Sequence, residues 1–203
     1  MKFFAILVAL VALASCSAAI PPAIKEEWAA TQRAQPGATT VVFFTDFQCP
    51  FCRRTHAALA PLLAQRGDSV RLVIRHVPLQ RHPDARTAAR AAVCFEANVA
   101  RDATADPKRT SVLESEYVHA LMTAPDLSEG ACETMAEEHG ISREAMRRCL
   151  SDASTDARIE RDLALFESVH GDGVPLLFIG RTRLEGAQTK AALEDALDTE
   201  GGH

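Results

Sequence analysis

Two cysteines separated by two residues, Cys49 and Cys52, are the side chains whose type and spacing could do chemistry. Such a pair either ligates a metal ion or interconverts between dithiol and disulfide. Structural zinc needs four ligands, and the sequence has no second Cys-x-x-Cys pair and no histidine pair at the zinc-finger distance after Cys52. A disulfide that closes so short a loop constrains the unfolded chain little. We therefore predict thiol–disulfide exchange, with no metal and no cofactor.

The segments on either side of the pair predict a strand followed by a helix. Residues Thr39–Phe44 are β-branched or aromatic with almost no alternation, which is typical of a strand buried on both faces. Residues Pro50–Gln65 predict a helix that Gly67 ends, because leucines recur at helical spacing at Leu59, Leu62 and Leu63. Pro50 suits the first turn of that helix.

Cys49 is thus expected where a helix begins. Free backbone N–H groups and the positive end of the helix dipole stabilise an anion there, and the anionic thiolate is the reactive form of cysteine. Cys52 lies one turn further along and is expected to be more enclosed. We predict that Cys49 is the nucleophile and that Cys52 is the resolving thiol, which attacks a mixed disulfide on Cys49.

The rest of the chain predicts an α/β domain interrupted by helices. A second β-branched run, Val70–Val77, completes a strand–helix–strand unit, which favours a parallel pair of strands. The pattern then predicts an Ala-rich helix over Pro83–Asn98, a polar loop over Asp102–Thr110, four helices within Ser111–Val169, strands over Val174–Ile179 and Arg181–Gly186, and a closing helix over Lys190–Leu197.

The N-terminal residues are typical of an export signal. Lys2 precedes an apolar run, Phe3–Ala14, that is too short to span a bilayer. Leu13-Ala14-Ser15-Cys16 resembles the lipobox of bacterial lipoproteins, which implies a signal peptide over residues 1–15 and a lipid on Cys16. Ordinary cleavage within 15–19 is the alternative. Both place the protein in the periplasm or cell envelope, and residues 16–37 are interpreted as a linker.

The cysteine pair and its surroundings resemble the DsbA-like branch of the thioredoxin superfamily. The matching runs are Asp46–Arg54, Arg75–Leu79 with His82-Pro83, and Val174-Pro175 before a strand. The resemblance implies a thioredoxin fold, a mixed central sheet flanked by helices, over 38–84 and 171–198, with a helical insertion over 85–170. It also implies a cis Pro175 that faces the cysteines. The backbone of Val174 would then pair with an extended substrate segment, beside Pro50 and Phe51.

Two departures from that family bear on the chemistry. Phe51 stands where the best-known members have histidine, and it cannot donate a hydrogen bond to a thiolate, so strong oxidising power is not implied. The position of the buried acid of thioredoxins holds Phe43. The nearest acid is Asp46, which could assist proton transfer at Cys52. We favour Asp46 as an acceptor for local backbone N–H groups.

Three further cysteines lie outside the redox motif. In many relatives a second disulfide joins the regions of Cys94 and Cys149, and the resemblance implies that bridge here. Sequence alone cannot choose connectivity, so a Cys132–Cys149 bridge stays open. Cys132 is otherwise expected to be a buried packing thiol.

We therefore expect an exported enzyme that exchanges disulfides with cysteine-containing exported proteins. An oxidase is favoured over a reductase because the compartment is oxidising, with reoxidation by a membrane redox partner. We expect a monomer. The net charge of -5 gives no general attraction to nucleic acid. A soft-metal carrier that binds Cu(I) through the same two cysteines is the alternative, and a tethered chaperone is a third possibility.

Overall fold

The structure, a computed structural model, describes residues 20–101 and 106–201. The predicted signal peptide and Cys16 lie outside the described residues. No helix in the described part combines the length and the apolar character needed to cross a bilayer.

A four-stranded mixed sheet forms the centre of the molecule. Its strands are β1 (Thr39–Thr45), β2 (Val70–His76), β3 (Leu176–Ile179) and β4 (Thr182–Glu185), in the order β2-β1-β3-β4. β1 runs parallel to β2, as the strand–helix–strand pattern predicted, and antiparallel to β3, which pairs antiparallel with β4. The predicted thioredoxin fold with a mixed sheet is therefore confirmed.

β1 is buried on both faces because the layers on each side of the sheet are helical. Val41 and Phe43 contact one hydrophobic cluster, and Val42 and Phe44 contact the other; all four side chains are 0% exposed. The unbroken run of β-branched and aromatic residues is what such a two-sided strand requires. The prediction from the sequence is confirmed.

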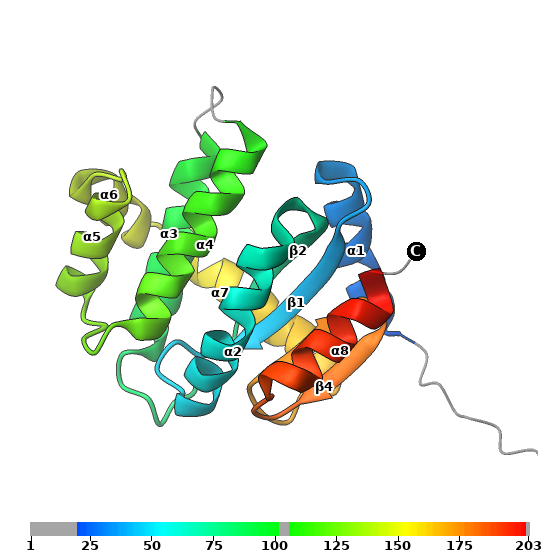
Figure 1. Cartoon of the computed structure of the whole chain (residues 1–203). Helices are drawn as coiled ribbons and strands as arrows, with labels where there is room; N and C mark the ends of the chain where they lie inside the picture. Colours follow the sequence, from blue (N-terminus) through cyan, green and yellow to red (C-terminus); the bar gives the residue numbers. More distant parts are fainter. Residues whose placement is uncertain (1–19, 102–105, 202–203) are drawn as a thin grey trace, which may run out of the picture.

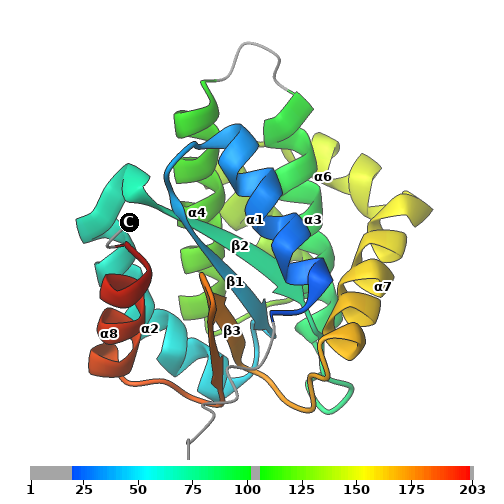
Figure 2. The ribbon, with the colours of Figure 1, turned by 90° about the vertical axis from the view of Figure 1, so that its right-hand side faces the viewer.

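Two helices cover the face that carries Val41 and Phe43. They are α2 (Pro50–Arg66), which is followed by the short 3-10 helix Gly67–Ser69, and α8 (Lys190–Gly201). Leu59 of α2 and Leu193 of α8 join the same buried cluster. In Figure 2 these two helices lie together on one side of the strands.

The opposite face is covered by α1 (Pro22–Ala34) and α7 (Ala153–Ser168). Ile24 of α1 and Phe166 of α7 pack in one cluster with Val42 and Phe44, and Trp28 is partly buried against it. The interpretation of residues 16–37 as a linker is therefore wrong for 22–34. Ile24 is 0% exposed, so this segment forms a helix that belongs to the folded domain.

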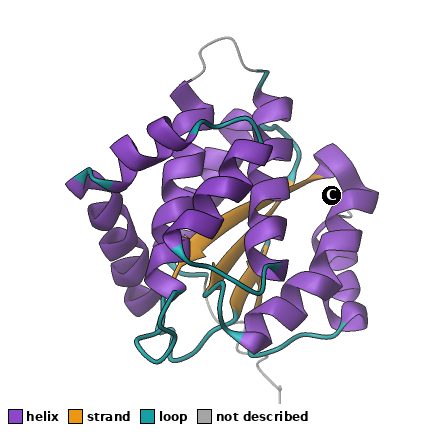
Figure 3. Ribbon diagram, turned by 90° about the vertical axis from the view of Figure 1, so that its left-hand side faces the viewer, coloured by secondary structure: helices purple, strands orange, loops and turns teal. Residues whose placement is uncertain are grey.

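The remaining helices form a subdomain beside the sheet. They are α3 (Ala85–Arg101), α4 (Pro107–Thr123), α5 (Glu129–Glu138) and α6 (Arg143–Leu150), seen to one side of the strands in Figure 1 and in front of them in Figure 3. Pro107, predicted to lie in a loop, instead begins α4, where proline is tolerated. The subdomain shares its core with the thioredoxin part, because Ala88 of α3 and Tyr117 of α4 lie in one cluster with Val41 and Phe43.

A disulfide joins α3 and α6 of this subdomain, between Cys94 and Cys149. This is the pairing that the family resemblance implied, in place of Cys132–Cys149. Cys132 is a free thiol, 0% exposed, packed in the main cluster.

Candidate active site

Cys49 lies at the N-cap position of α2, directly after the loop that leaves β1. Its backbone N–H donates to the Asp46 carbonyl at 3.1 Å, and its own carbonyl accepts from the Arg53 N–H at 3.0 Å, the first bond of the helix. Pro50 follows at the first helical position. Cys49 therefore stands at the start of the helix, where the first-turn N–H groups have no partner within the helix, and its side chain makes no capping hydrogen bond.

Both cysteines of the pair are free thiols and both are 0% exposed. The sequence led us to expect Cys52 to be the more enclosed of the two, and that difference in exposure is not present. A client sulfur can reach Cys49 only after neighbouring side chains move. Between the two cysteines, Phe51 is 48% exposed and stands at the surface.

The surroundings of Cys52 keep its sulfur protonated. Burial raises the pKa of Cys52 to about 12, and the adjacent Cys49 adds to this increase. Two groups act in the other direction and lower the pKa: the Thr45 side chain and the backbone N–H of Asp46. The second sulfur of the pair is therefore a buried thiol with hydrogen-bond donors close to it.

Asp46 fixes the approach to Cys49 with its carboxylate. Oδ1 accepts the backbone N–H groups of Gln48 at 2.7 Å and Cys49 at 3.1 Å. Oδ2 accepts the N–H of Leu79 at 2.9 Å and lies 2.8 Å from Nδ1 of His82. The side chain is 0% exposed. The local-acceptor interpretation of Asp46 agrees with these contacts, which leave the carboxylate no free lone pair pointing at Cys52.

A second set of contacts ties the same two loops together. Gln48 Nε2 donates to Asp84 Oδ2 at 3.2 Å, and the Asp84 backbone N–H donates to Gln48 Oε1 at 2.9 Å. The roles of His82 and Gln48 were not identified from the sequence, because their partners are more than thirty residues away. The only available signal was the position of His82 within the family pattern.

The loop before β3 lies at the same end of the sheet. The Val174–Pro175 peptide bond is cis, and Leu176 pairs with Phe44, so residues 174–175 stand beside the last residue of β1 and the loop to Cys49. The Pro175 carbonyl accepts the N–H of Gly186 at 2.9 Å. Val174 is half-buried and contacts the cluster that contains both cysteines.

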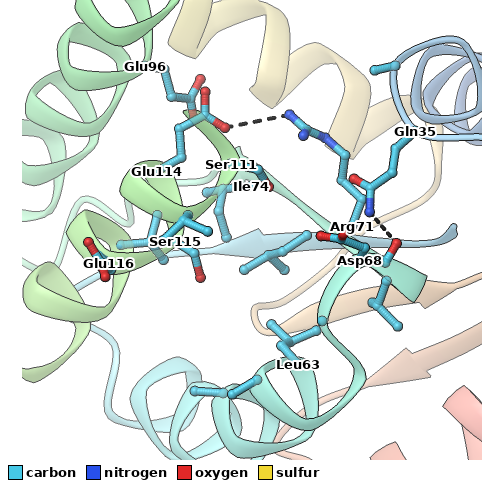
Figure 4. A pocket seen from close by; sticks show the side chains of 18 of the residues that line it. Gln35, Leu63, Asp68, Arg71, Ile74, Glu96, Ser111, Glu114, Ser115 and Glu116 are labelled. Carbon is cyan, nitrogen blue, oxygen red and sulfur yellow. Dashed lines mark hydrogen bonds and ion pairs between the residues drawn. The ribbon is translucent and has the colours of Figure 1, made fainter. Parts of the chain in front are cut away.

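A cavity of about 650 Å³ lies away from the cysteines, between α2, β2 and α4 (Figure 4). Its walls carry Glu96 and Glu114, and Arg71 forms an ion pair with Glu114 at 3.5 Å. None of the predicted site residues lines it. Within residues 20–101 and 106–201, no group of three or more His, Cys, Asp or Glu side chains is placed to hold a metal ion.

A thioredoxin-type sheet with a Cys-x-x-Cys pair where the helix after β1 begins defines a thiol–disulfide oxidoreductase. Residues 35–199 match the protein family described as Thioredoxin. The chain belongs to this family.

Solved structures are similar to this chain over most of its length. A thioredoxin-like oxidoreductase from Silicibacter pomeroyi is 26% identical, with a TM-score of 0.66 over 84% of this chain and 91% of that one. BdbD from Bacillus subtilis (18% identity, TM-score 0.66) aligns over 85% of this chain and 95% of that one. The α-DsbA2 protein of Wolbachia pipientis (16%, 0.66) aligns over 86% and 94%. At these two lower identities the likeness concerns the fold.

Curated relatives match this chain over a small part of their own length. The Na(+)/H(+) antiporter NhaA 3 of Salinispora tropica is 30% identical over 161 residues, which is 78% of this chain and 22% of the antiporter. The NhaA of Herminiimonas arsenicoxydans is 28% identical over 166 residues, 77% of this chain and 24% of that protein. The chain therefore spans about a quarter or less of these relatives.

Proposed function

We propose that this protein is an exported thiol–disulfide oxidase that introduces disulfides into exported proteins. A client thiolate attacks the Cys49 sulfur of the Cys49–Cys52 disulfide, and Cys52 leaves as a thiolate that takes up a proton. A second client thiolate then attacks the mixed disulfide, so the client becomes oxidised and the Cys49–Cys52 pair becomes a dithiol. A membrane redox partner reoxidises the pair.

The observation that carries this proposal is the asymmetry of the two cysteines. Cys49 stands at the helix start, where an anion is stabilised, whereas burial raises the pKa of Cys52 to about 12. We therefore assign the attack to Cys49, while Cys52 stays a thiol at neutral pH until an exchange needs it. This supports Cys49 as the nucleophile and Cys52 as the resolving thiol.

The exported location is supported by the second disulfide. A bridge between Cys94 and Cys149 persists in oxidising compartments and is rare in the cytosol. We propose that the signal peptide ends at residue 15, that Cys16 carries a lipid, and that the monomer is held at the cell envelope. Within this compartment oxidation is the favoured direction of exchange.

For client binding we propose the surface around the exposed Phe51. The Arg54 guanidinium stacks over the Phe51 ring at 4.7 Å from its centroid, which gives an apolar and cationic rim beside Pro50. On the other side, the backbone of Val174 before Pro175 pairs with an extended client segment. Together, the Phe51 surface and the Val174 backbone would position a client cysteine next to Cys49.

The test is covalent trapping in cells. Cys52→Ser removes the resolving thiol, so mixed disulfides between Cys49 and clients should accumulate and appear as bands that disappear on reduction. Cys49→Ser should trap none. Cys132→Ser is the matched control, because it removes a buried thiol that the reaction does not use. Equal trapping by the Cys49 and Cys52 variants would contradict the assigned roles, and no trapping by either would contradict the enzyme.

The redox state of the pair in cells decides the direction. Blocking free thiols at the time of lysis should show the wild-type pair mostly oxidised. A pair held reduced would mean a reductase. Stoichiometric copper in anaerobically purified wild type that is lost in Cys49→Ser would instead support the metal carrier.

A further inference from the structure

Thr45, the last residue of β1, carries a buried hydroxyl group without a hydrogen bond. The residue is 1% exposed, and Oγ1 has no hydrogen-bond partner in the structure. A buried hydroxyl without a partner costs about 1–3 kcal/mol, so native structures rarely keep one unless it has another use. Valine, which has the same shape, would suit this β-strand position without that cost.

Thr45 lies on the same face of β1 as Val41 and Phe43, the face that α2 covers and whose buried cluster contains Cys52. The Thr45 side chain is the first of the groups that lower the pKa of Cys52, against the larger effect of burial. Cys52 lies in the buried cluster that also contains Phe43 of β1 and Phe47 of the loop after it. This short loop connects Thr45 to the start of α2. The hydroxyl is therefore in place to donate a hydrogen bond once the sulfur becomes an anion.

The nearest carboxylate is already occupied. The Asp46 carboxylate accepts three backbone N–H groups and the His82 side chain, so it is not available to the sulfur. The backbone N–H of Asp46 is the other donor near Cys52. Thr45 is the side chain that lowers the pKa of Cys52 and that has no other hydrogen-bond partner.

We propose that Thr45 is a catalytic residue whose hydroxyl donates a hydrogen bond to the Cys52 thiolate during disulfide exchange. The step rests on the proposed function. When a client thiolate attacks Cys49, the Cys49–Cys52 bond breaks and its electron pair goes to the Cys52 sulfur, which Thr45 stabilises before a proton from water arrives. In the reverse step, Cys52 gives up its proton to water, and its thiolate attacks Cys49 and releases the client thiolate. The same hydrogen bond accelerates both directions.

The experiment compares Thr45→Val with Thr45→Ser in the oxidised protein. Each protein is mixed with a single-cysteine peptide and quenched with acid at successive times, and the mixed disulfide is quantified by mass spectrometry. A hydrogen bond to a charged sulfur predicts that Thr45→Val slows both formation and decay of the mixed disulfide by about ten- to a hundredfold. Thr45→Ser, which keeps the hydroxyl, should stay within a few-fold of wild type.

Thermal unfolding separates this role from a structural one. Because the hydroxyl has no partner in the dithiol form, Thr45→Val should melt at or above the wild-type temperature. Thr40→Val, on the same strand and also buried, is the control and should leave the rates unchanged. Exchange rates of Thr45→Val equal to those of Thr45→Ser would overturn the proposal for Thr45. A wild type that forms no mixed disulfide would overturn the proposed function itself, so the two failures are seen in different proteins.

Discussion

The Asp46 carboxylate fixes the backbone conformation of the loop that carries Cys49. Asp46 accepts from Gln48 and Cys49 with one oxygen and from Leu79 and His82 with the other, and its side chain is fully buried. A buried charge is tolerated when it is hydrogen-bonded and paired, as here. The backbone at Cys49 is therefore held by contacts from two loops that are distant in sequence.

Replacing Asp46 should loosen this arrangement in a graded way. Asp46→Ala leaves the N–H groups of Gln48 and Leu79 without an acceptor, whereas that of Cys49 still donates to the Asp46 carbonyl. At about 1–3 kcal/mol for each lost acceptor, the free energy of unfolding should fall by roughly 2–5 kcal/mol. Asp46→Asn should cost less, because its oxygen still accepts from Gln48 and Cys49 while its amide turns a donor toward Leu79. Urea unfolding measures this series, with the exposed Asp172→Asn as the control. A loss below 1 kcal/mol in Asp46→Ala would contradict the network.

The sequence identified the cysteines because their chemistry is local. A two-residue spacing, a preceding strand and a following helix all lie within a short stretch, and Cys49 is at the helix start as predicted. The equal burial of Cys49 and Cys52 and the contact of Asp46 with His82 depend on how the 77–84 loop packs. No local pattern encodes that packing.

At the scale of elements, the disulfide holds the insertion together. It joins α3 to α6 across 55 residues of chain, and α5 lies between them in sequence. Arg147 at the surface of α6 binds the buried Glu133 of α5 through two hydrogen bonds of 2.9 and 2.8 Å. The outer helices of the subdomain are therefore attached mainly to one another and to α3.

Removing the bridge should destabilise the protein without touching the reactive pair. The Cys94→Ala, Cys149→Ala double variant should lose about 2–4 kcal/mol in the free energy of unfolding, because a loop of 55 residues is released in the unfolded chain. Its rate of disulfide exchange through Cys49, measured below the unfolding transition, should stay within a few-fold of wild type. Cys132→Ala serves as the control for loss of a buried sulfur. Stability equal to that control would contradict the structural role of the bridge.

The presence of most helices and strands followed from the sequence pattern, whereas the layer of the fold in which each one lies did not. Continuous β-branched runs gave β1 and β2, and helical spacing gave α2 and the four helices from α4 to α7. The helix at 22–34 was underestimated because its apolar side, with Ile24 and Trp28, is narrow and its surroundings are polar. Packing of Ile24 on the sheet stabilises that helix, and packing is a tertiary effect that sequence periodicity does not report.

For the whole molecule, buried ionisable groups oppose one another in their effect on stability. Burial lowers the pKa of His56 to about 4 and of His76 to about 3, so their contribution to stability is lost as pH falls from about 6.5 toward these values. Burial raises the pKa of Glu96 to about 7, against the influence of Arg158. Glu96 therefore destabilises the fold increasingly as pH rises from about 4.5 to 7.

Between pH 5 and 6.5 the stabilisation from the histidines and the destabilisation from Glu96 partly cancel as pH rises. Glu96→Gln should remove the second effect. The unfolded chain binds protons at the histidines, and the folded chain keeps one on Glu96, whose side chain faces the cavity of Figure 4. Without that carboxyl, the free energy of unfolding should rise more steeply with pH, and its difference from wild type should grow by about 1–3 kcal/mol from pH 5 to pH 8. Urea unfolding at several pH values measures the difference, with the exposed Glu116→Gln as control. The substitution also removes the 3.5 Å contact with Arg158, which lowers the free energy of unfolding at every pH and leaves its slope against pH unchanged. Parallel curves of unfolding free energy against pH for Glu96→Gln and wild type would therefore mean that Glu96 is ionised in the fold at all these pH values.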